Sequence, residues 1–189
     1  VFMKLVARIG TVELDATEII FVIASASFMP AAGLGQACAT TIGKLLGENN
    51  QDKAYLSVFE TMRMTSVFMG VMGIIFFLFP QNILRIFTNN QIVIDAGSLS
   101  LQVLGLLQIF DAMSQTLWFS LNGAGDTKFT AYLGIVASWC IFVPFSYLLG
   151  IKLNFGLAGP WIAFGLYLFI ETVLIIFRVW QGKWKHIEV

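Results

Sequence analysis

Residues 96–125 read AGSLSLQVLGLLQIFDAMSQTLWFSLNGAG, a stretch whose only charged side chain is Asp111. It is long and apolar enough to cross a membrane as a helix, because the hydrocarbon core takes about 20 apolar residues. A charge at that depth costs roughly 2.5–3.5 kcal/mol on insertion scales, and such residues usually serve ion or substrate pathways. Asp111 is therefore the first candidate for an ion or cation site inside a membrane protein.

The rest of the composition agrees with a membrane protein. The chain is 58% hydrophobic and 12% charged, and further charge-free runs cover residues 19–43, 64–84, 129–151 and 153–170. Soluble proteins rarely carry so many runs of this length. Strands of a membrane barrel would be shorter and would alternate apolar with polar residues. We therefore predict an all-α, polytopic helical membrane protein.

Charges, glycines and prolines set the expected helix boundaries. We expect five complete membrane-spanning helices, at about 16–46, 54–79, 93–122, 127–150 and 157–180. Residues 1–9 are predicted to be the end of a sixth, earlier helix, so we expect a fragment whose upstream part is missing. Residues 80–90 suit either a short interfacial helix or a plain loop.

The placement of lysine and arginine predicts the orientation, because cytoplasmic loops carry an excess of these residues. One predicted side holds Lys44, Lys53, Arg63, Lys128, Arg178, Lys183 and Lys185, and the other holds Lys4, Arg8, Arg85 and Lys152. This bias predicts a multi-pass protein of the inner (plasma) membrane with a cytoplasmic C-terminus. Trp180 and Trp184 are expected to form an interfacial anchor. The zero net charge predicts no nucleic-acid partner.

The predicted helix around Asp111 carries a polar stripe. Its members are spaced by three or four residues, which places them on one face with Ser114 beside them: Gln108, Asp111, Gln115, Trp118 and Asn122. Such a stripe is unstable against lipid and should face protein or a water-filled cavity. In one interpretation it is a cavity wall on which Asp111 binds a proton or a sodium ion, or pairs with a cationic substrate. In the other it is a hydrogen-bonded seam between helices, with Asp111 protonated or paired.

Two other helices supply further candidates. The predicted helix 16–46 is longer than the membrane core, and Pro30 removes a backbone donor where a bend is expected. Nearby small and polar residues, among them Gln36, suit either close helix contact or a cavity lining with a hinge at Pro30. Glu171 lies well inside the last predicted helix and is a candidate for transport. Arg178 lies about 10 Å further along that helix, too far for direct pairing with Glu171.

Other chemistry is sparse. Cys38 and Cys140 fall inside predicted helices, where we expect both to be small buried apolar residues. The sequence shows no metal-ligand spacing, no serine or cysteine triad and no phosphate-binding glycine loop. We therefore predict that the protein is not an enzyme and has no cofactor. No metal is expected beyond a sodium ion at Asp111, should sodium be the coupling ion.

Several short motifs follow one another along nearly the whole chain. They are LVARIGT at 5–11, ELDAT at 13–17, FMPAAGLGQA at 28–37, TIGKLLGEN at 41–49, FDA at 110–112, LNGAGDTK at 121–128 and, after Arg178, GKWK at 182–185. In this order and spacing they resemble the multidrug and toxic compound extrusion (MATE) transporters. FDA and the turn after it are similar to the tenth helix of that family and its following turn.

The resemblance implies an architecture and a site. Family members have twelve helices in two six-helix lobes, and residues 1–189 then correspond to the C-terminal lobe, truncated at its N-terminus. Asp111 matches the position of a cation-binding aspartate in sodium-coupled members. Leu107 stands where some of those members have a tyrosine, and their partner glutamate would precede Val1. The resemblance therefore leaves sodium and protons both open as the coupling ion.

The expected function is that of a secondary active antiporter, which exports organic cations or drugs in exchange for sodium ions or protons by alternating access. The implied partners are a small organic cation, membrane lipid and the missing N-terminal lobe of the same chain. Phe28, Trp118 and Phe119 offer aromatic contact to such a substrate. One alternative is a flippase for lipid-linked saccharides of the same superfamily, which would be expected to need cationic side chains in its cavity. The other is a non-transporting membrane scaffold, which would need no buried carboxylate.

Overall fold

The computed structural model describes residues 2–153, 155–182 and 184, and the regular elements within them are helices. Five segments are long and apolar enough to cross a membrane: α2 (Thr11–Gly47), α3 (Gln51–Leu78), α5 (Gln91–Gly123), the segment Thr127–Lys152 and α8 (Ala158–Trp180). Two short helices, α1 (Phe2–Ile9) and α4 (Pro80–Phe87), accompany them. The predicted all-α membrane fold with five complete spans is confirmed.

The helix boundaries lie close to the predicted ones. The largest difference is the start of α2, which begins at Thr11 instead of residue 16 and so takes the acidic residues near its N-terminus into the helix. Of the two alternatives for residues 80–90, the helix is the one formed. Pro80 occupies the first turn of α4, where its missing N–H is not needed. Leu84 is buried and Arg85 is exposed, which is the amphipathic pattern of an interfacial helix.

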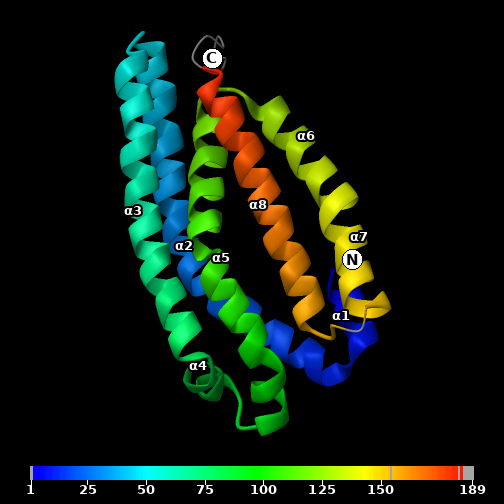
Figure 1. Ribbon diagram of the computed structural model, residues 1–189. Coiled ribbons are helices and arrows are strands. Elements are labelled where there is room, and N and C mark those ends of the chain that lie inside the picture. The colour runs from blue at the N-terminus through cyan, green and yellow to red at the C-terminus, as the bar shows by residue number, and fades with distance from the viewer. Residues whose placement is uncertain (1, 154, 183, 185–189) are drawn as a thin grey trace.

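The centre of the bundle is α5, which packs against α2, α3 and α8. The 37 residues of α2 would extend about 56 Å if straight. Figure 1 shows that α2 instead crosses obliquely at the end near α1 and then runs alongside α3. Pro30 lies within this helix and cannot donate to the carbonyl of Ala26, one turn earlier. The missing bond permits the change of direction, and that change brings α2 across the N-terminal end of α8.

The fourth span is a continuous helix of mixed geometry. It consists of α6 (Thr127–Ala137), a π-helical segment η1 (Ser138–Phe142), α7 (Val143–Tyr147) and a second π-helical segment η2 (Leu148–Lys152). The amide of Val143 donates to the carbonyl of Ser138, which is the i to i−5 bond of a π-helix. Pro144 follows at once, and its ring cannot fit against the carbonyl one turn earlier. The prediction of one span at 127–150 is therefore right in extent, but the helix is not regular.

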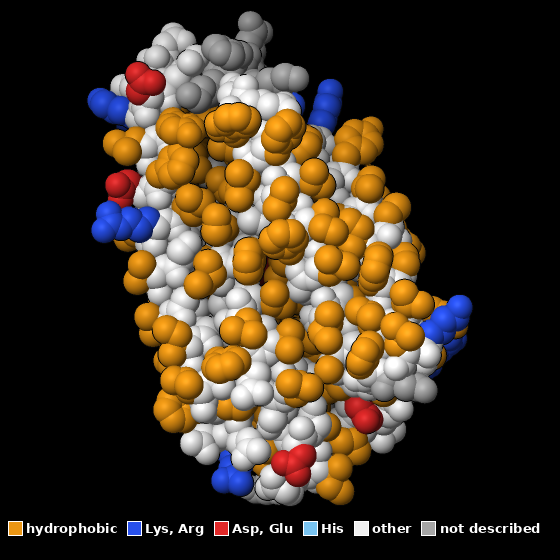
Figure 2. Space-filling view, viewed as in Figure 1, with side chains coloured by type: hydrophobic (Ala, Val, Ile, Leu, Met, Phe, Trp, Pro, Cys, Tyr) orange, Lys and Arg blue, Asp and Glu red, His pale blue; other side chains and the backbone are white. Residues whose placement is uncertain are grey.

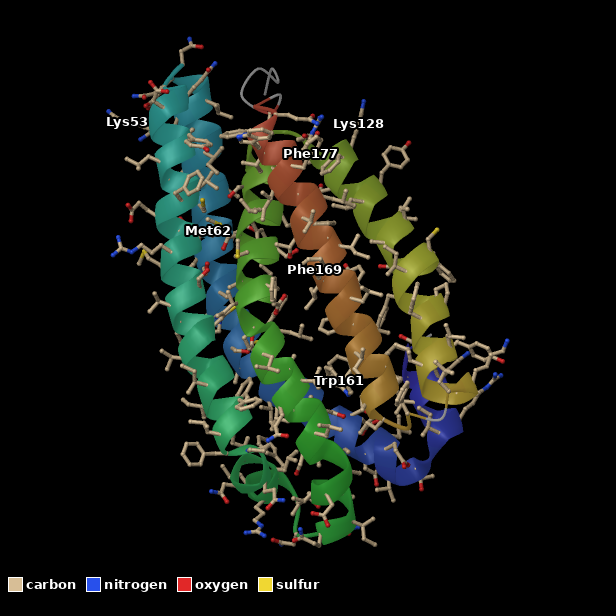
Figure 3. All side chains as sticks on the ribbon, in the orientation of Figure 1. Lys53, Met62, Lys128, Trp161, Phe169 and Phe177 are labelled. Carbon is tan, nitrogen blue, oxygen red and sulfur yellow. The ribbon has the colours of Figure 1, made fainter. Side chains whose placement is uncertain are left out.

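The outer surface has the polarity expected of a membrane protein. Hydrophobic side chains cover the middle of the face seen in Figure 2, and charged ones lie toward its edges. Lys53 and Lys128 lie at the same end of the bundle, as the predicted sidedness requires (Figure 3). Two details correct the sequence predictions. Cys140 is exposed, because it faces outward from η1. Trp184 is not a surface anchor, since it is 1% exposed and its indole N–H donates to the carbonyl of Val179.

Candidate functional site

The polar stripe of α5 begins with Gln108, which is turned toward α2. Its side-chain amide donates to the hydroxyl of Ser27 across 2.8 Å. Both residues are 1% exposed, so the bond is formed in an interior without competing water. The 3.6-residue period of α5 then places Asp111 about one turn further along the same face. The stripe is therefore turned inward at this level, toward α2 and α8.

A cavity of about 320 Å³ lies beside this part of α5. Three helices line it, with residues Phe21, Ala24, Ser25, Ser27 and Phe28 from α2, Leu104, Gln108 and Asp111 from α5, and Trp161 and Phe164 from α8. Figure 3 shows Trp161 near the N-terminal end of α8, in the region where α2 passes. The oblique course of α2 supplies one wall of this space. Asp111 supplies its one carboxyl group among otherwise aromatic, aliphatic and neutral polar side chains.

Two polar atoms on the cavity residues lack hydrogen-bond partners in the described structure. They are Oε1 of Gln108, an acceptor, and the indole Nε1 of Trp161, a donor. Both residues are 1% exposed, and a buried polar group without a partner costs about 1–3 kcal/mol. Native proteins rarely leave such groups unsatisfied. A donor, an acceptor and a carboxyl group around one cavity therefore point to a ligand that satisfies them.

Beyond Asp111, the next turn of α5 meets a second carboxyl group on α8. The hydroxyl of Ser114 donates to Oε2 of Glu171 across 3.2 Å, and the hydroxyl of Tyr167 donates to Oε1 across 3.0 Å. Glu171 is 5% exposed. Gln115 lies on the same turn of α5 within hydrogen-bonding reach of Asp111, and its buried Oε1 has no partner in the described structure. The helices α5 and α8 thus enclose a polar cluster at mid-span.

The stripe ends at the turn between α5 and α6. Asn122 accepts a hydrogen bond from the hydroxyl of Thr130 at 2.6 Å. Asp126 accepts from Nε of Arg178 at 2.7 Å, and the guanidinium of Arg178 also lies over the ring of Phe129, 5.1 Å from its centroid. As predicted, Arg178 does not pair with Glu171; its partner is in the turn. This end of the stripe is a structural connection between helices.

Among the predicted cavity-lining residues, Gln108 is the one on the wall of the cavity that the described residues form. Ser114, Gln115 and Glu171 belong to the polar cluster beyond it, and the other candidates stand elsewhere. Trp118 packs over Gly134 of α6, and Phe119 packs against Gly35 of α2. Gln36 and Pro30 are exposed and do not line the cavity formed by the described residues. The reason is geometric, because the cavity touches only the first part of α2, before Pro30. Of the three aromatic residues expected to receive a substrate, Phe28 is the one on the cavity wall.

Sequence reasoning missed two residues that matter here, Trp161 and Tyr167. Tyr167 lies four residues before Glu171, and this spacing on a predicted helix was enough to place both on one face. Trp161 gave no such signal, because an apolar helix contains many aromatic residues with no further role. As for metal ligands, the described residues contain no group of three or more His, Cys, Asp or Glu side chains placed to hold an ion.

Comparison with known proteins identifies relatives of this chain. The sequence model of the MatE family matches residues 1–148. A probable multidrug resistance protein NorM of Thermotoga maritima is 29% identical over 163 residues, which is 86% of this chain and 35% of that protein. Multidrug and toxin extrusion protein 2 of Mus musculus is 24% identical over 183 residues, which is 97% of this chain and 32% of that protein. This chain thus spans about a third of the length of these relatives.

A solved structure has the same arrangement of helices. The crystal structure of the eukaryotic MATE transporter AtDTX14 matches 97% of this chain and 42% of its own, with a TM-score of 0.87 and 25% identity. The similarity therefore extends through α8, beyond the residues that the family model matches.

Proposed function

This chain belongs to the MATE family of membrane transporters, and we propose that it is the C-terminal lobe of an antiporter that exports organic cations in exchange for protons or sodium ions. The observation that carries the proposal is the position of Asp111. It supplies the one carboxyl group of an otherwise uncharged, largely apolar cavity, beside a donor and an acceptor that lack partners. A carboxyl group in such surroundings favours a cation or a proton as its partner.

The coupling step follows from the charge of Asp111. When a proton or sodium ion from outside reaches the cavity, it neutralises the carboxylate and removes its attraction for a cationic substrate. The substrate then leaves outward, and the ion is released after the protein returns to its inward-open state. The ion shifts this equilibrium only by the difference in its affinity for the two states. Asp111 therefore has to be more strongly solvated, or better paired, in one state than in the other.

The cavity walls suit the expected substrate class. The rings of Phe28, Trp161 and Phe164 offer apolar contact and cation–π attraction to a flat organic cation. The free acceptor on Gln108 and the free donor on Trp161 offer it two directional contacts. A flippase for lipid-linked saccharides is less well supported, because none of the lining residues is a lysine or arginine that would hold a phosphate.

The proposal includes the location of the protein. We place the end of the bundle that carries Lys53 and Lys128 on the cytoplasmic side of the plasma membrane, together with the C-terminal end of α8. The helices α2 and α3 present large apolar side chains outward, such as Met29 and Val67, which are 71% and 63% exposed. These faces are available to lipid or to the N-terminal lobe of the complete protein.

The test is transport by the complete protein in proteoliposomes loaded with a fluorescent organic cation. Efflux is measured under a sodium gradient and, separately, under a proton gradient, for the wild type and for Asp111→Asn. The expected result is efflux driven by one of the two gradients and abolished by the substitution. Asp95→Asn is the control, because Asp95 is an exposed aspartate of the same helix.

Three other outcomes would count against parts of the proposal. If neither gradient drives efflux by the wild type, the antiporter is contradicted, and a flippase or a scaffold becomes the better hypothesis. If Asp111→Asn transports as well as the wild type, the antiporter stands but Asp111 is not its coupling site. If Asp111→Leu leaves every measured function intact and raises stability, the carboxyl group has no role and the scaffold is favoured.

A further inference from the structure

Glu171 is a buried carboxyl group that the proposed mechanism does not use. It lies on α8, and two hydroxyl groups donate to it, one on each carboxyl oxygen: Ser114 of α5 at 3.2 Å and Tyr167 of α8 at 3.0 Å. Both hydroxyl groups can donate to an ionised carboxylate, and either can rotate to accept a hydrogen bond from a protonated one. The site can therefore hold the carboxyl group of Glu171 either ionised or protonated.

Glu171 and Asp111 lie at the same level of the bundle. The hydroxyl of Thr172, next to Glu171, donates to the carbonyl of Phe110, next to Asp111, across 3.2 Å. One turn earlier, Leu107 packs against Gly165 so closely that a Cβ on the glycine would lie 2.9 Å from Cδ1 of the leucine. The helices α5 and α8 are therefore in close contact at the level of the two acids and about one turn of α5 before it.

No basic residue balances these two acids in the described structure. The groups that interact electrostatically with Glu171 are Tyr167 of its own helix and Asp111 of α5, and neither is a lysine or arginine. From the fourth span, Ser138 of η1 faces the hydroxyl of Tyr167 and is uncharged. Arg178 is paired with Asp126 near the end of α8. Two carboxylates in a protein interior without a counter-charge repel each other, so the pair favours the uptake of a proton or another monovalent cation.

Unsatisfied amide groups flank the two acids. Oε1 of Gln108, which is 1% exposed and lines the cavity with Asp111, has no hydrogen-bond partner in the described structure. On the other side, the amide of Gln115 lies within hydrogen-bonding reach of Asp111, and its buried Oε1 lacks a partner there. Carboxylate and amide oxygens are the ligands that hard cations take. The free oxygens therefore indicate a cation independently of the two acids.

We propose that Glu171, held by Ser114 and Tyr167, is a second cation-binding carboxyl group that shares the coupling cation with Asp111. The proposal rests on the proposed antiport function and adds a residue on α8 to its site. The ligand is one monovalent cation, either a proton or a sodium ion. While it is bound, the charge between α5 and α8 is partly balanced. After its release the two carboxylates repel across the contact between these helices and favour a different arrangement of them.

The test measures cation binding by the complete protein in detergent, without transport. Binding of radioactive sodium ions gives the sodium affinity, and proton uptake in weakly buffered solution gives the proton affinity. We expect Glu171→Gln to lower the affinity for the coupling cation by about tenfold or more, because a charged ligand becomes neutral. Glu171→Asp should recover part of the affinity. Tyr167→Phe should lower it by about threefold, because one hydrogen bond to the carboxylate is lost.

Matched controls separate this role from structural damage. Glu60→Gln removes an exposed acid of α3, and Tyr132→Phe removes the hydroxyl of a tyrosine that is 71% exposed. Both should bind the cation as the wild type does. A thermal unfolding curve for every variant identifies any that fails to fold. Should Glu171→Gln fail, Tyr167→Phe and Ser114→Ala provide the test, because both keep the carboxyl group.

The outcomes distinguish this inference from the function on which it rests. If Asp111→Asn abolishes binding while the Glu171, Tyr167 and Ser114 variants stay within about twofold of the wild type, Glu171 is not a ligand and the inference is overturned. If Asp111→Asn itself keeps full cation affinity, the proposed coupling site is wrong. Loss of affinity in both Asp111→Asn and Glu171→Gln, with unchanged controls, supports the shared site.

Discussion

Arg178 donates its Nε–H to Oδ2 of Asp126 across 2.7 Å and so ties the end of α8 to the turn between α5 and α6. Asp126 directly precedes α6, yet its carboxylate does not cap that helix. The Asp126 side chain is 6% exposed and that of Arg178 is 23% exposed. This is therefore a largely desolvated pair, unlike the surface pair of Lys44 and Glu48.

Asp126→Asn should destabilise the protein, because it leaves the guanidinium of Arg178 without its counter-charge in a partly buried site. We expect the free energy of unfolding to fall by about 1–3 kcal/mol. Thermal unfolding in detergent is the measurement. Glu48→Gln is the control, since its ion pair with Lys44 is 3.9 Å long and its side chains are 55% and 76% exposed. Glu48→Gln should lower the free energy of unfolding by less than about 0.5 kcal/mol. Equal small effects of the two changes would contradict the prediction.

Ser27→Ala should also destabilise the folded protein, because it removes the hydroxyl that accepts a hydrogen bond from the buried amide of Gln108. We expect the free energy of unfolding to fall by about 1–3 kcal/mol. Adding Gln108→Met should recover part of that loss, since the stranded amide is then replaced by an apolar side chain of similar length. A double-mutant cycle on the unfolding free energies tests this coupling. Strictly additive effects would show that the bond contributes little. In transport assays Gln108→Met should still impair efflux, because the cavity loses its free acceptor.

Gly105→Ala should disturb the contact between α3 and α5. A Cβ at this position would lie 2.7 Å from the carbonyl oxygen of Gly73, which is backbone and cannot move aside alone. The expected loss is about 1–3 kcal/mol of unfolding free energy. Gly47→Ala is the control, because nothing lies within 4 Å of its added Cβ. Unchanged stability of Gly105→Ala, measured by thermal unfolding, would mean that the two helices do not approach as closely as described.

Pro30→Ala should separate stability from transport. The substitution restores a backbone donor to the bent helix α2, and alanine is a far better helix former than proline. We expect unfolding free energy to stay constant or rise by about 1–2 kcal/mol, and the transport rate to fall because the bend is stiffened. Pro80→Ala is the control, because a proline in the first turn of α4 costs no hydrogen bond. Wild-type transport by Pro30→Ala would rule out a hinge at this residue.

The local sequence was sufficient to predict the membrane-spanning helices of this protein. Each span is a long apolar run, and a chain in a membrane has to satisfy its backbone within the segment, which leaves the helix as the solution for such runs. The inward-facing stripe was predictable for the same reason, because helical periodicity alone puts Gln108, Asp111 and Gln115 on one face. The acids of interest, Asp111 and Glu171, were both recognisable as charges inside apolar segments.

Partners between helices were not predictable in this way. Ser27 and Gln108 are 81 residues apart, Asp126 and Arg178 are 52 apart, and Ser114 and Glu171 are 57 apart. The residues near each of these side chains in sequence do not indicate which of the many polar side chains on other helices will be its hydrogen-bond partner. The π-helical segments η1 and η2 were missed because one additional residue in a turn barely alters the apolar pattern.

The membrane class, the five spans and the identity of the buried charges depend on composition and on the period of a helix, so all three were predictable from the order of the amino acids. Tertiary structure alone decided which side chains surround Asp111. The cavity exists because α2 bends and crosses the start of α8, which brings Phe28 and Trp161 to one space and leaves Trp118 and Gln36 outside it. Packing of distant segments depends on the shapes of whole helices, and one residue's neighbours in sequence do not contain that information.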